Sequence, residues 1–211
     1  MWSKAMSNRP FVNGQEAIAV PFAPEWYERG PVAINDKHNL KVSAVYQLPI
    51  GRHRMLFSGM NRWLDGAVGG WDTSGYFAFI SGPPLTFPMP DATLGNGWGT
   101  RADLVGNPNL SNRSKLEWFN VSAFAAPPLY QWGTSGIGAV TGPNFTQLNL
   151  SLSKDFYWRE GEYLQFRAEA YNAFNNVRLG APDTTLGDSN FGMILSDAGP
   201  RTMQLSARIV F

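Results

Sequence analysis

The sequence contains no cysteine in its 211 residues. Disulfide-stapled scaffolds, thiolate metal centres and cysteine nucleophiles are therefore excluded. The chain also lacks an excess of either charge, because 17 lysines and arginines balance 16 aspartates and glutamates. A nearly neutral chain has no electrostatic basis for binding nucleic acid, so we expect no nucleic-acid partner.

Long hydrophobic runs are missing as well, although hydrophobic residues make up 44% of the chain. A membrane-spanning helix needs about 20 consecutive apolar residues, and no stretch approaches that length. Any crossing of a membrane must therefore be made by strands. The 22 glycines and 15 prolines also argue against a helical bundle.

The known signatures of catalysis are absent too. The sequence contains no P-loop, no dinucleotide-binding fingerprint, no HExxH and no Gly-x-Ser-x-Gly motif. The two histidines, His38 and His53, lie near opposite ends of one expected strand and cannot share a metal ion. We therefore expect no catalytic residue, no metal site, no cofactor and no enzyme activity.

Five segments alternate apolar and polar residues with the period of two that marks a strand with two unlike faces. They are Asn39–Leu48, Trp71–Ser81, Phe145–Phe156, Glu162–Phe174 and Arg201–Phe211. Each is about ten residues long or longer, against a usual strand of about five or six. About ten tilted residues span the apolar core of a bilayer. The expected fold class is all-β: antiparallel strands of a transmembrane β-barrel, about five or six of them, with long extracellular loops.

The last segment shows the alternation most clearly. Its apolar face carries Leu205, Ala207, Ile209 and the C-terminal Phe211. A terminal aromatic ring is favoured in the interfacial girdle of an outer-membrane barrel. We therefore predict that these four residues form the barrel-closing signal that the assembly machinery recognises.

The polar faces of two segments carry charged and amide side chains. Arg167 and Glu169 lie on one segment, and Gln204 and Arg208 lie on the last one. In a barrel they would point into the lumen, where charge is tolerated, whereas in a soluble sandwich they would simply be solvated. We expect Arg167 and Glu169 to form structural pairs across strands rather than to act in catalysis.

Long and shorter links alternate between the five segments. The long links are residues 7–37, 82–144 and 175–200, the tight one is 157–161, and the intermediate one is 49–70. Outer-membrane barrels show this sidedness, with short periplasmic turns and long extracellular loops. The pattern places Phe211 on the periplasmic side. We expect irregular loops for the long links, which are rich in turn-forming residues, and a helical turn near residues 60–67.

Aromatic residues in the largest link are candidates for contact with a ligand. They are Trp98, Trp118, Tyr130 and Trp132. Such rings could stack on sugars or peptides, or they could only anchor the loop. The sequence leaves both readings open.

Short motifs also occur in a fixed order along the chain. They include Trp2–Ala5 (WSKA), Tyr46–Gly51 (YQLPIG), Leu164–Asn172 and Gly199–Phe211. In this order they resemble the C-terminal barrel region of Oar-like TonB-dependent outer-membrane transporters.

The resemblance implies a barrel of about 22 strands that encloses a plug domain in the bacterial outer membrane. The implied partners are outer-membrane lipid, the remainder of the barrel and the plug, the TonB complex and the barrel-assembly machinery. On this resemblance, residues 1–211 are the C-terminal portion of the barrel, without plug domain or signal peptide. The chain would then be a fragment that is not active alone.

Three functions follow as hypotheses. The leading one is a segment of a TonB-dependent receptor and transporter for a bulky nutrient. The second is a soluble, secreted β-sandwich that binds carbohydrate through aromatic loops. The third is a β-structured glycosidase, which would need two carboxylates placed across a cleft.

Overall fold

The structure is a computed structural model that describes residues 1–8, 11–12, 15–16, 22–52, 54–89 and 100–211. The chain divides into two compact units. The sheet unit comprises Leu40–Phe79, Thr146–Val177 and Gly199–Phe211. The loop unit comprises Met1–Asn39, Ile80–Phe145 and Arg178–Ala198, so it contains most of the long links.

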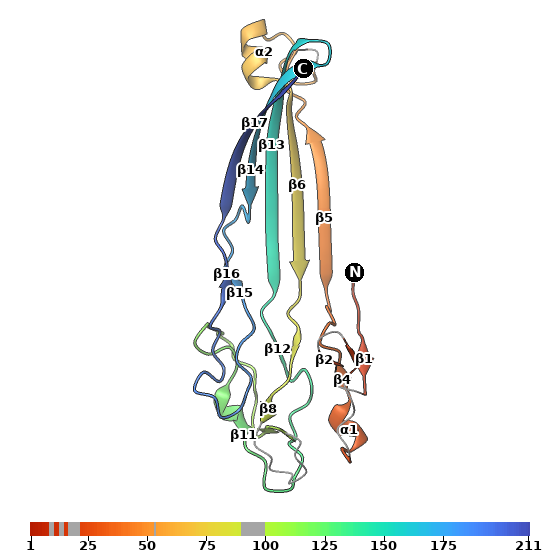
Figure 1. Cartoon of the computed structure of the whole chain (residues 1–211), viewed down its shortest axis with the longest axis vertical. Coiled ribbons are helices and arrows are strands. Elements are labelled where there is room, and N and C mark those ends of the chain that lie inside the picture. Colours follow the sequence, from red (N-terminus) through yellow and green to blue (C-terminus); the bar gives the residue numbers. More distant parts are fainter. Residues whose placement is uncertain (9–10, 13–14, 17–21, 53, 90–99) are drawn as a thin grey trace. The chain divides into compact units, whose positions relative to one another are not determined.

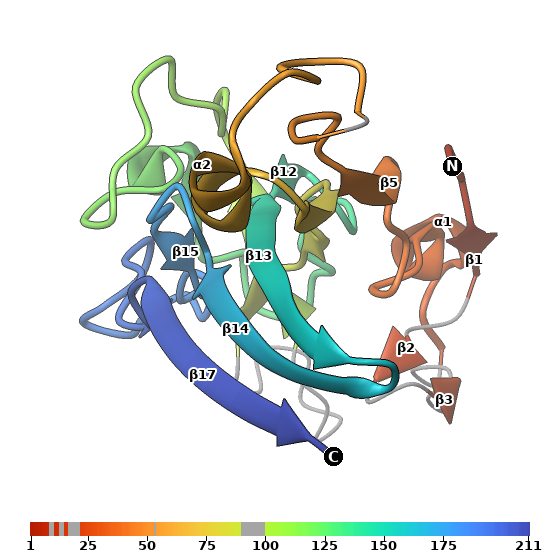
Figure 2. The same ribbon diagram turned by 90° about the horizontal axis from the view of Figure 1, so that it is seen from above.

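A single five-stranded sheet forms the sheet unit, in the order β17-β14-β13-β6-β5 (Figure 1). Its strands are β5 (Asn39–Gln47), β6 (Trp71–Ile80), β13 (Phe145–Arg159), β14 (Glu162–Tyr171) and β17 (Thr202–Val210). Neighbouring strands run in opposite directions, and β13, β14 and β17 follow a common curve (Figures 1 and 2). Within the described residues, β5 and β17 each have one neighbour in this sheet, so it is open at both edges.

The observed strands confirm the five alternating segments, but β14 ends at Tyr171 instead of Phe174, and the tight link also differs. That link is shorter than expected, because β13 continues to Arg159 and only Glu160 and Gly161 form the turn. Gly161 has φ +82°, a conformation that suits glycine at a two-residue hairpin turn. A register shift between Tyr157 and Arg159 accommodates the extra residue of β13 as a bulge.

The register of the sheet places apolar residues opposite apolar ones and polar residues opposite polar ones. Ala168 of β14 pairs with Leu152 of β13 on one side and with Leu205 of β17 on the other. The next residue, Arg167, pairs with Ser153 and Ser206. Because directly opposite residues share a face of a sheet, the sheet has one apolar and one polar face.

Within the described residues, much of the apolar face is exposed. Leu205 is 82% exposed and Ile209 is 62% exposed, and nearly all of β5 and β17 is exposed. A soluble sheet buries its apolar face against another sheet or a helix, because apolar area left in water costs about 25 cal/mol per Å². This sheet therefore requires an apolar environment outside the chain.

The link between β5 and β6 contains a short helix, α2 (Arg62–Val68), near the expected helical turn. Asn61 caps its first turn, because its side-chain oxygen accepts a hydrogen bond of 2.8 Å from the amide of Leu64. Gly69 ends the helix, and its amide donates to the carbonyl of Asp65. No helix in the described part of the chain is long and apolar enough to cross a membrane.

The loop unit is built from short antiparallel strand pairs. They are β1 (Met6–Ser7) with β4 (Gly30–Pro31), β2 (Phe11–Val12) with β3 (Gln15–Glu16), β7 (Pro84–Leu85) with β12 (Val140–Thr141), β8 (Pro88–Met89) with β9 (Thr100–Arg101), β10 (Asp103–Leu104) with β11 (Phe124–Ala125), and β15 (Arg178–Leu179) with β16 (Asp197–Ala198). A helical turn, α1 (Glu25–Glu28), and a 3-10 helix, η1 (Val121–Ala123), complete it.

A cluster of phenylalanines forms the core of the loop unit. The ring centroid of Phe87 lies 4.0 Å from that of Phe124 and 4.9 Å from that of Phe119. Phe191, from a different link, lies 5.1 Å from Phe119. The described parts of these links are irregular as expected, with turns, bends and two-residue strands. Their packing was not expected: residues of the 175–200 link pack against a hydrophobic core formed by the 82–144 link. The turn-forming residues that dominate these links conceal a few widely spaced aromatic residues that meet only in the fold.

A buried arginine fixes the α1 segment within the loop unit. The guanidinium of Arg101 lies 3.6 Å from the ring centroid of Tyr27, and it donates hydrogen bonds to the carbonyls of Tyr27 and Ser135. Burial lowers the pKa of Arg101, and the nearby Tyr27 and Glu28 act in the opposite direction. Because two carbonyls and a ring face surround the cation, Arg101 joins three segments of this unit.

The core of the loop unit yields a stability prediction. Phe87→Ala removes a ring with 0% exposure and should lower the free energy of opening this unit by about 3–5 kcal/mol. Native-state hydrogen exchange at the amides of Ala102 and Ala123 measures this opening. Leu116→Ala, at a side chain that is 75% exposed, is the control and should change it by less than about 0.5 kcal/mol. Unchanged protection in Phe87→Ala would contradict the assigned core.

Candidate functional site

The polar face of the sheet is the candidate functional site. Three strands contribute to it in register, so that its side chains form three cross-strand rows. The rows are Ser151–Glu169–Gln204, Ser153–Arg167–Ser206 and Asp155–Gln165–Arg208. All four polar residues singled out from the sequence therefore share one face.

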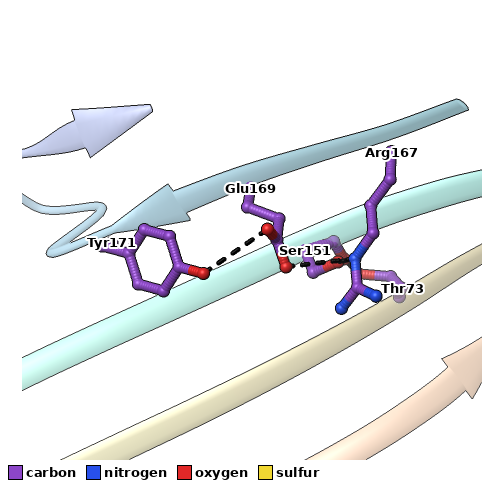
Figure 3. A network of polar contacts seen from close by, with 5 residues as sticks. All are labelled: Thr73, Ser151, Arg167, Glu169 and Tyr171. Atoms are coloured by element: carbon purple, nitrogen blue, oxygen red, sulfur yellow. Dashed lines mark hydrogen bonds and ion pairs between the residues drawn. The ribbon is translucent and has the colours of Figure 1, made fainter. Parts of the chain in front are cut away.

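A chain of polar contacts runs along this face (Figure 3). Arg167 Nε lies 3.0 Å from Glu169 Oε1 and donates a 3.1 Å hydrogen bond to Ser151 Oγ. The hydroxyl of Tyr171 donates to Glu169 Oε2 at 3.4 Å, and Thr73 Oγ1 donates to the carbonyl of Ser151 at 3.1 Å. Strands β6, β13 and β14 are thereby joined through polar side chains as well as through backbone pairing.

The ion pair of this face differs from the sequence-based expectation. Arg167 and Glu169 pair along strand β14 rather than across strands. The side chain of Arg167 is 45% exposed and that of Glu169 is 20% exposed, so the pair contributes at most about 1 kcal/mol. Its main effect is to hold two charged groups close together on the polar face.

The edge strand contributes polar groups that remain free. In the described part of the chain, the side chains of Gln204 and Arg208 form no hydrogen bond or ion pair. Asp155, on the same face, accepts hydrogen bonds from Gln165 Nε2 at 2.8 Å and from the hydroxyl of Tyr157 at 3.3 Å. Sequence reasoning did not assign Asp155, Gln165 or Tyr157 to the site, although their alternation with apolar residues carries the signal.

The opposite face carries the predicted barrel-closing residues. Leu205, Ala207 and Ile209 lie on this apolar face, opposite Ala168, Phe166 and Leu164 of β14. These three pairs place the residues beside other apolar side chains of the sheet.

Phe211 follows the end of β17 and is 99% exposed. It lies near the β13–β14 turn, because the preceding Val210 pairs with Tyr163. The rings of Tyr157 and Tyr163 are 5.1 Å apart at this same end of the sheet. Aromatic side chains therefore gather where the chain ends and where the shortest turn lies.

The aromatic candidates of the largest link lie in different environments. Trp118 packs against the core of the loop unit, and its Nε1 donates a 3.0 Å hydrogen bond to the carbonyl of Thr141. The ring of Trp132 lies 4.7 Å from that of Tyr27, whereas Tyr130 is 76% exposed. Trp98 lies outside the described residues. The geometry of Trp118 and Trp132 suits loop anchors, and ligand contact by Tyr130 stays a prediction.

Metal binding finds no support in the described ranges. Among those residues, no group of three or more His, Asp or Glu side chains could hold a metal ion. Whether the chain has any enzyme activity is untested, and its absence stays a prediction.

The amino-acid sequence matches a known family whose fold agrees with the geometry of this sheet. Residues 1–204 match the model of the outer membrane beta barrel domain family. The chain belongs to this family. No curated protein and no solved structure matches the chain.

Membership of this family settles the environment of the sheet. The protein is located in the bacterial outer membrane, and its all-β, antiparallel fold is that of an outer-membrane barrel domain whose sheet is open here. Outer-membrane barrels turn apolar side chains towards lipid and polar ones towards the lumen, so we expect the apolar face of this sheet to face lipid and its polar face to line the lumen. The hypothesis of a soluble, secreted sandwich is wrong, because this family is membrane-embedded.

The two faces predict opposite costs for adding a charge. Phe166→Arg places a cation on the lipid face and should lower the free energy of unfolding by about 2–4 kcal/mol near the bilayer midplane. Gln165→Arg, one residue earlier on the polar face, should change it by less than about 1 kcal/mol, because Asp155 lies next to it. Denaturant unfolding of the protein folded into phospholipid vesicles measures both. Equal costs at the two positions would contradict the assignment of the faces.

Proposed function

We propose that the chain forms wall strands and extracellular loops of a TonB-dependent transporter that imports a bulky nutrient. The observation that carries the proposal is the open sheet with a polar, charge-bearing face. Five strands fall short of the about eight that close the smallest single-chain barrels. A transporter barrel of about 22 strands supplies partners for both β5 and β17. The ordered motifs from Trp2 to Phe211 support the same subtype.

The loop unit suits the capture of a large ligand. Two long links share an aromatic core, so the exposed side chains above that core are held on a rigid base. A preorganised loop surface loses less conformational entropy on binding than a flexible one. By the transporter resemblance, a captured ligand then enters the lumen when the plug domain rearranges. TonB transmits the energy for that step from the inner membrane.

The polar face suits a passage for hydrophilic solutes. Arg167 and Glu169 are fixed by mutual contact, while Gln204 and Arg208 at the edge strand are available to a plug domain or a solute. The chain alone does not transport on this proposal, because the remainder of the barrel and the plug are required. Its working partners are these parts, outer-membrane lipid, the TonB complex and the barrel-assembly machinery.

Energised uptake tests the transport proposal. We expect that deleting the gene in its source bacterium lowers the uptake of at least one bulky compound at least tenfold, in a panel of radiolabelled oligosaccharides and peptides. Restoring the gene should restore uptake. A protonophore should abolish the same uptake in the wild type, because TonB draws on the proton-motive force. Uptake that persists without the proton-motive force would contradict this proposal and indicate a passive pore.

A variant of the C-terminal aromatic residue tests whether the barrel-assembly machinery recognises this chain. Phe211→Ala should lower assembly into the outer membrane of cells severalfold, as measured by heat-modifiable mobility of membrane fractions. Folding of the purified protein into vesicles without assembly machinery should be unchanged, because a ring that is 99% exposed makes little packing contact. Phe174→Ala, at a ring that is 67% exposed, is the control and should leave both measurements unchanged. An equal loss in cells and in vesicles would show a role in stability instead.

A further inference from the structure

The link between β5 and β6, residues 48–70, is unexpectedly long for its position. It lies at the same end of the sheet as the C-terminus and the β13–β14 turn (Figure 1). That turn consists of only Glu160 and Gly161, as is usual on the periplasmic side of a barrel. A link that includes α2 and a cavity is more than is needed to join two neighbouring strands.

The surface of this link is apolar to an unusual degree. Its largely exposed apolar side chains are Met55 (81%), Leu56 (44%), Phe57 (67%), Trp63 (88%), Leu64 (54%) and Val68 (44%). Leu64 and Val68 lie four residues apart and share one side of α2, while Trp63 projects from an adjacent side. Such a concentration on a segment next to a lipid-facing sheet is typical of insertion into a membrane interface.

The same link borders a cavity of about 360 Å³ whose lining carries five charged side chains. Arg52, Arg54 and Lys154 contribute three positive charges to its wall. One carboxylate of the wall, Asp65, accepts a 2.6 Å hydrogen bond from the amide of Arg52. The other, Asp155, bonds to Gln165 on the polar face. With three cations and two carboxylates, the lining has a formal net charge of +1.

Lys154 is the exception in the alternation of β13. It pairs with Phe166, which places it on the apolar face, and it is only 3% exposed. Its ammonium donates to the carbonyls of Gly69 and Asp65 at the end of α2. The side chain of Lys154 thus starts on the apolar face, and its ammonium lies at the end of the sheet where the link is.

An apolar groove of about 430 Å³ lies on the same face as Lys154. Its lining includes Trp71, Leu152, Phe166, Ala168, Leu205 and Ala207. The two small residues, Ala168 and Ala207, leave room between the larger ones. Trp71 borders both sites, because its ring lies 5.7 Å from the ammonium of Lys154. The apolar groove and the cavity lined by Lys154 are therefore neighbours.

We propose that the β5–β6 link and the lipid face next to it form a binding site for an anionic phospholipid. One acyl chain occupies the groove, the phosphate lies against Arg52 and Arg54, and Lys154 adds to the positive potential. The exposed apolar side chains of the link insert into the interface of the periplasmic leaflet. Charge complementarity at the cavity and the apolar groove beside it together select a phospholipid, because a free anion would leave the groove empty. The inference rests on location in the membrane and is independent of transport.

Lipid titration followed by native mass spectrometry tests the site. The purified chain in detergent micelles should retain one phosphatidylglycerol molecule at low lipid concentration. The double variant Arg52→Gln with Arg54→Gln should weaken this binding at least tenfold. The control variant Arg62→Gln with Arg159→Gln removes the same charge from the link and from the end of β13, outside the cavity, and should change binding less than twofold. An equal loss in both variants would overturn the proposal, because it would indicate nonspecific attraction.

A second variant and a second probe test the acyl groove. Ala207→Phe fills the groove from the edge strand and should also weaken phosphatidylglycerol binding at least fivefold. Inorganic phosphate should displace the lipid only at concentrations far above those of the lipid itself. Effective displacement by phosphate, together with unchanged binding in Ala207→Phe, would identify a site for free anions and overturn the proposal. Circular dichroism of each variant verifies that the sheet is retained. None of these binding measurements depends on nutrient uptake, so they do not test the transport proposal.

Discussion

The structure depends on the cross-strand register of β13, β14 and β17. Because Ala168 lies opposite both Leu152 and Leu205, and Arg167 lies opposite Ser153 and Ser206, every second residue of three strands faces the same medium. A shift of one residue in any pair would place charges among the leucines. An exposed apolar face is favoured in lipid and a polar face in water, so this register suits a sheet that separates the two media.

The loop unit shows how the long links acquire structure without long strands. Phe87 and Phe119 belong to the core that one link forms, and Phe191 from another link packs against it. Arg101 adds a second, polar centre through its contacts with Tyr27 and Ser135. Ordered loops of this kind give an outer-membrane protein a defined surface, on which exposed side chains such as Tyr130 are presented.

Sequence reasoning located the strands well and the packing poorly, for physical reasons. Alternation with period two is local, so all five strands and the faces of Arg167, Glu169, Gln204 and Arg208 could be predicted. The pairing of Arg167 with Glu169 along one strand could not, because side-chain rotamers decide between the neighbours within reach. The aromatic core also escaped prediction, since it joins residues about 100 positions apart whose local surroundings are typical of turns. Lys154 breaks the alternation, and only the fold gives it partners, at the end of α2.

The central claim is that successive residues of the sheet face lipid and water in turn. Because the chain lacks cysteine, spin labels can be attached one at a time along Thr202–Val210 of the protein in bilayers, and their collision rates with oxygen and with a water-soluble nickel complex compared. Oxygen accessibility should be highest at Met203, Leu205, Ala207 and Ile209, and nickel accessibility at Gln204, Ser206 and Arg208. Oscillation of the two signals in opposite phase is the predicted result. Signals that rise and fall together, or that do not alternate, would contradict the account.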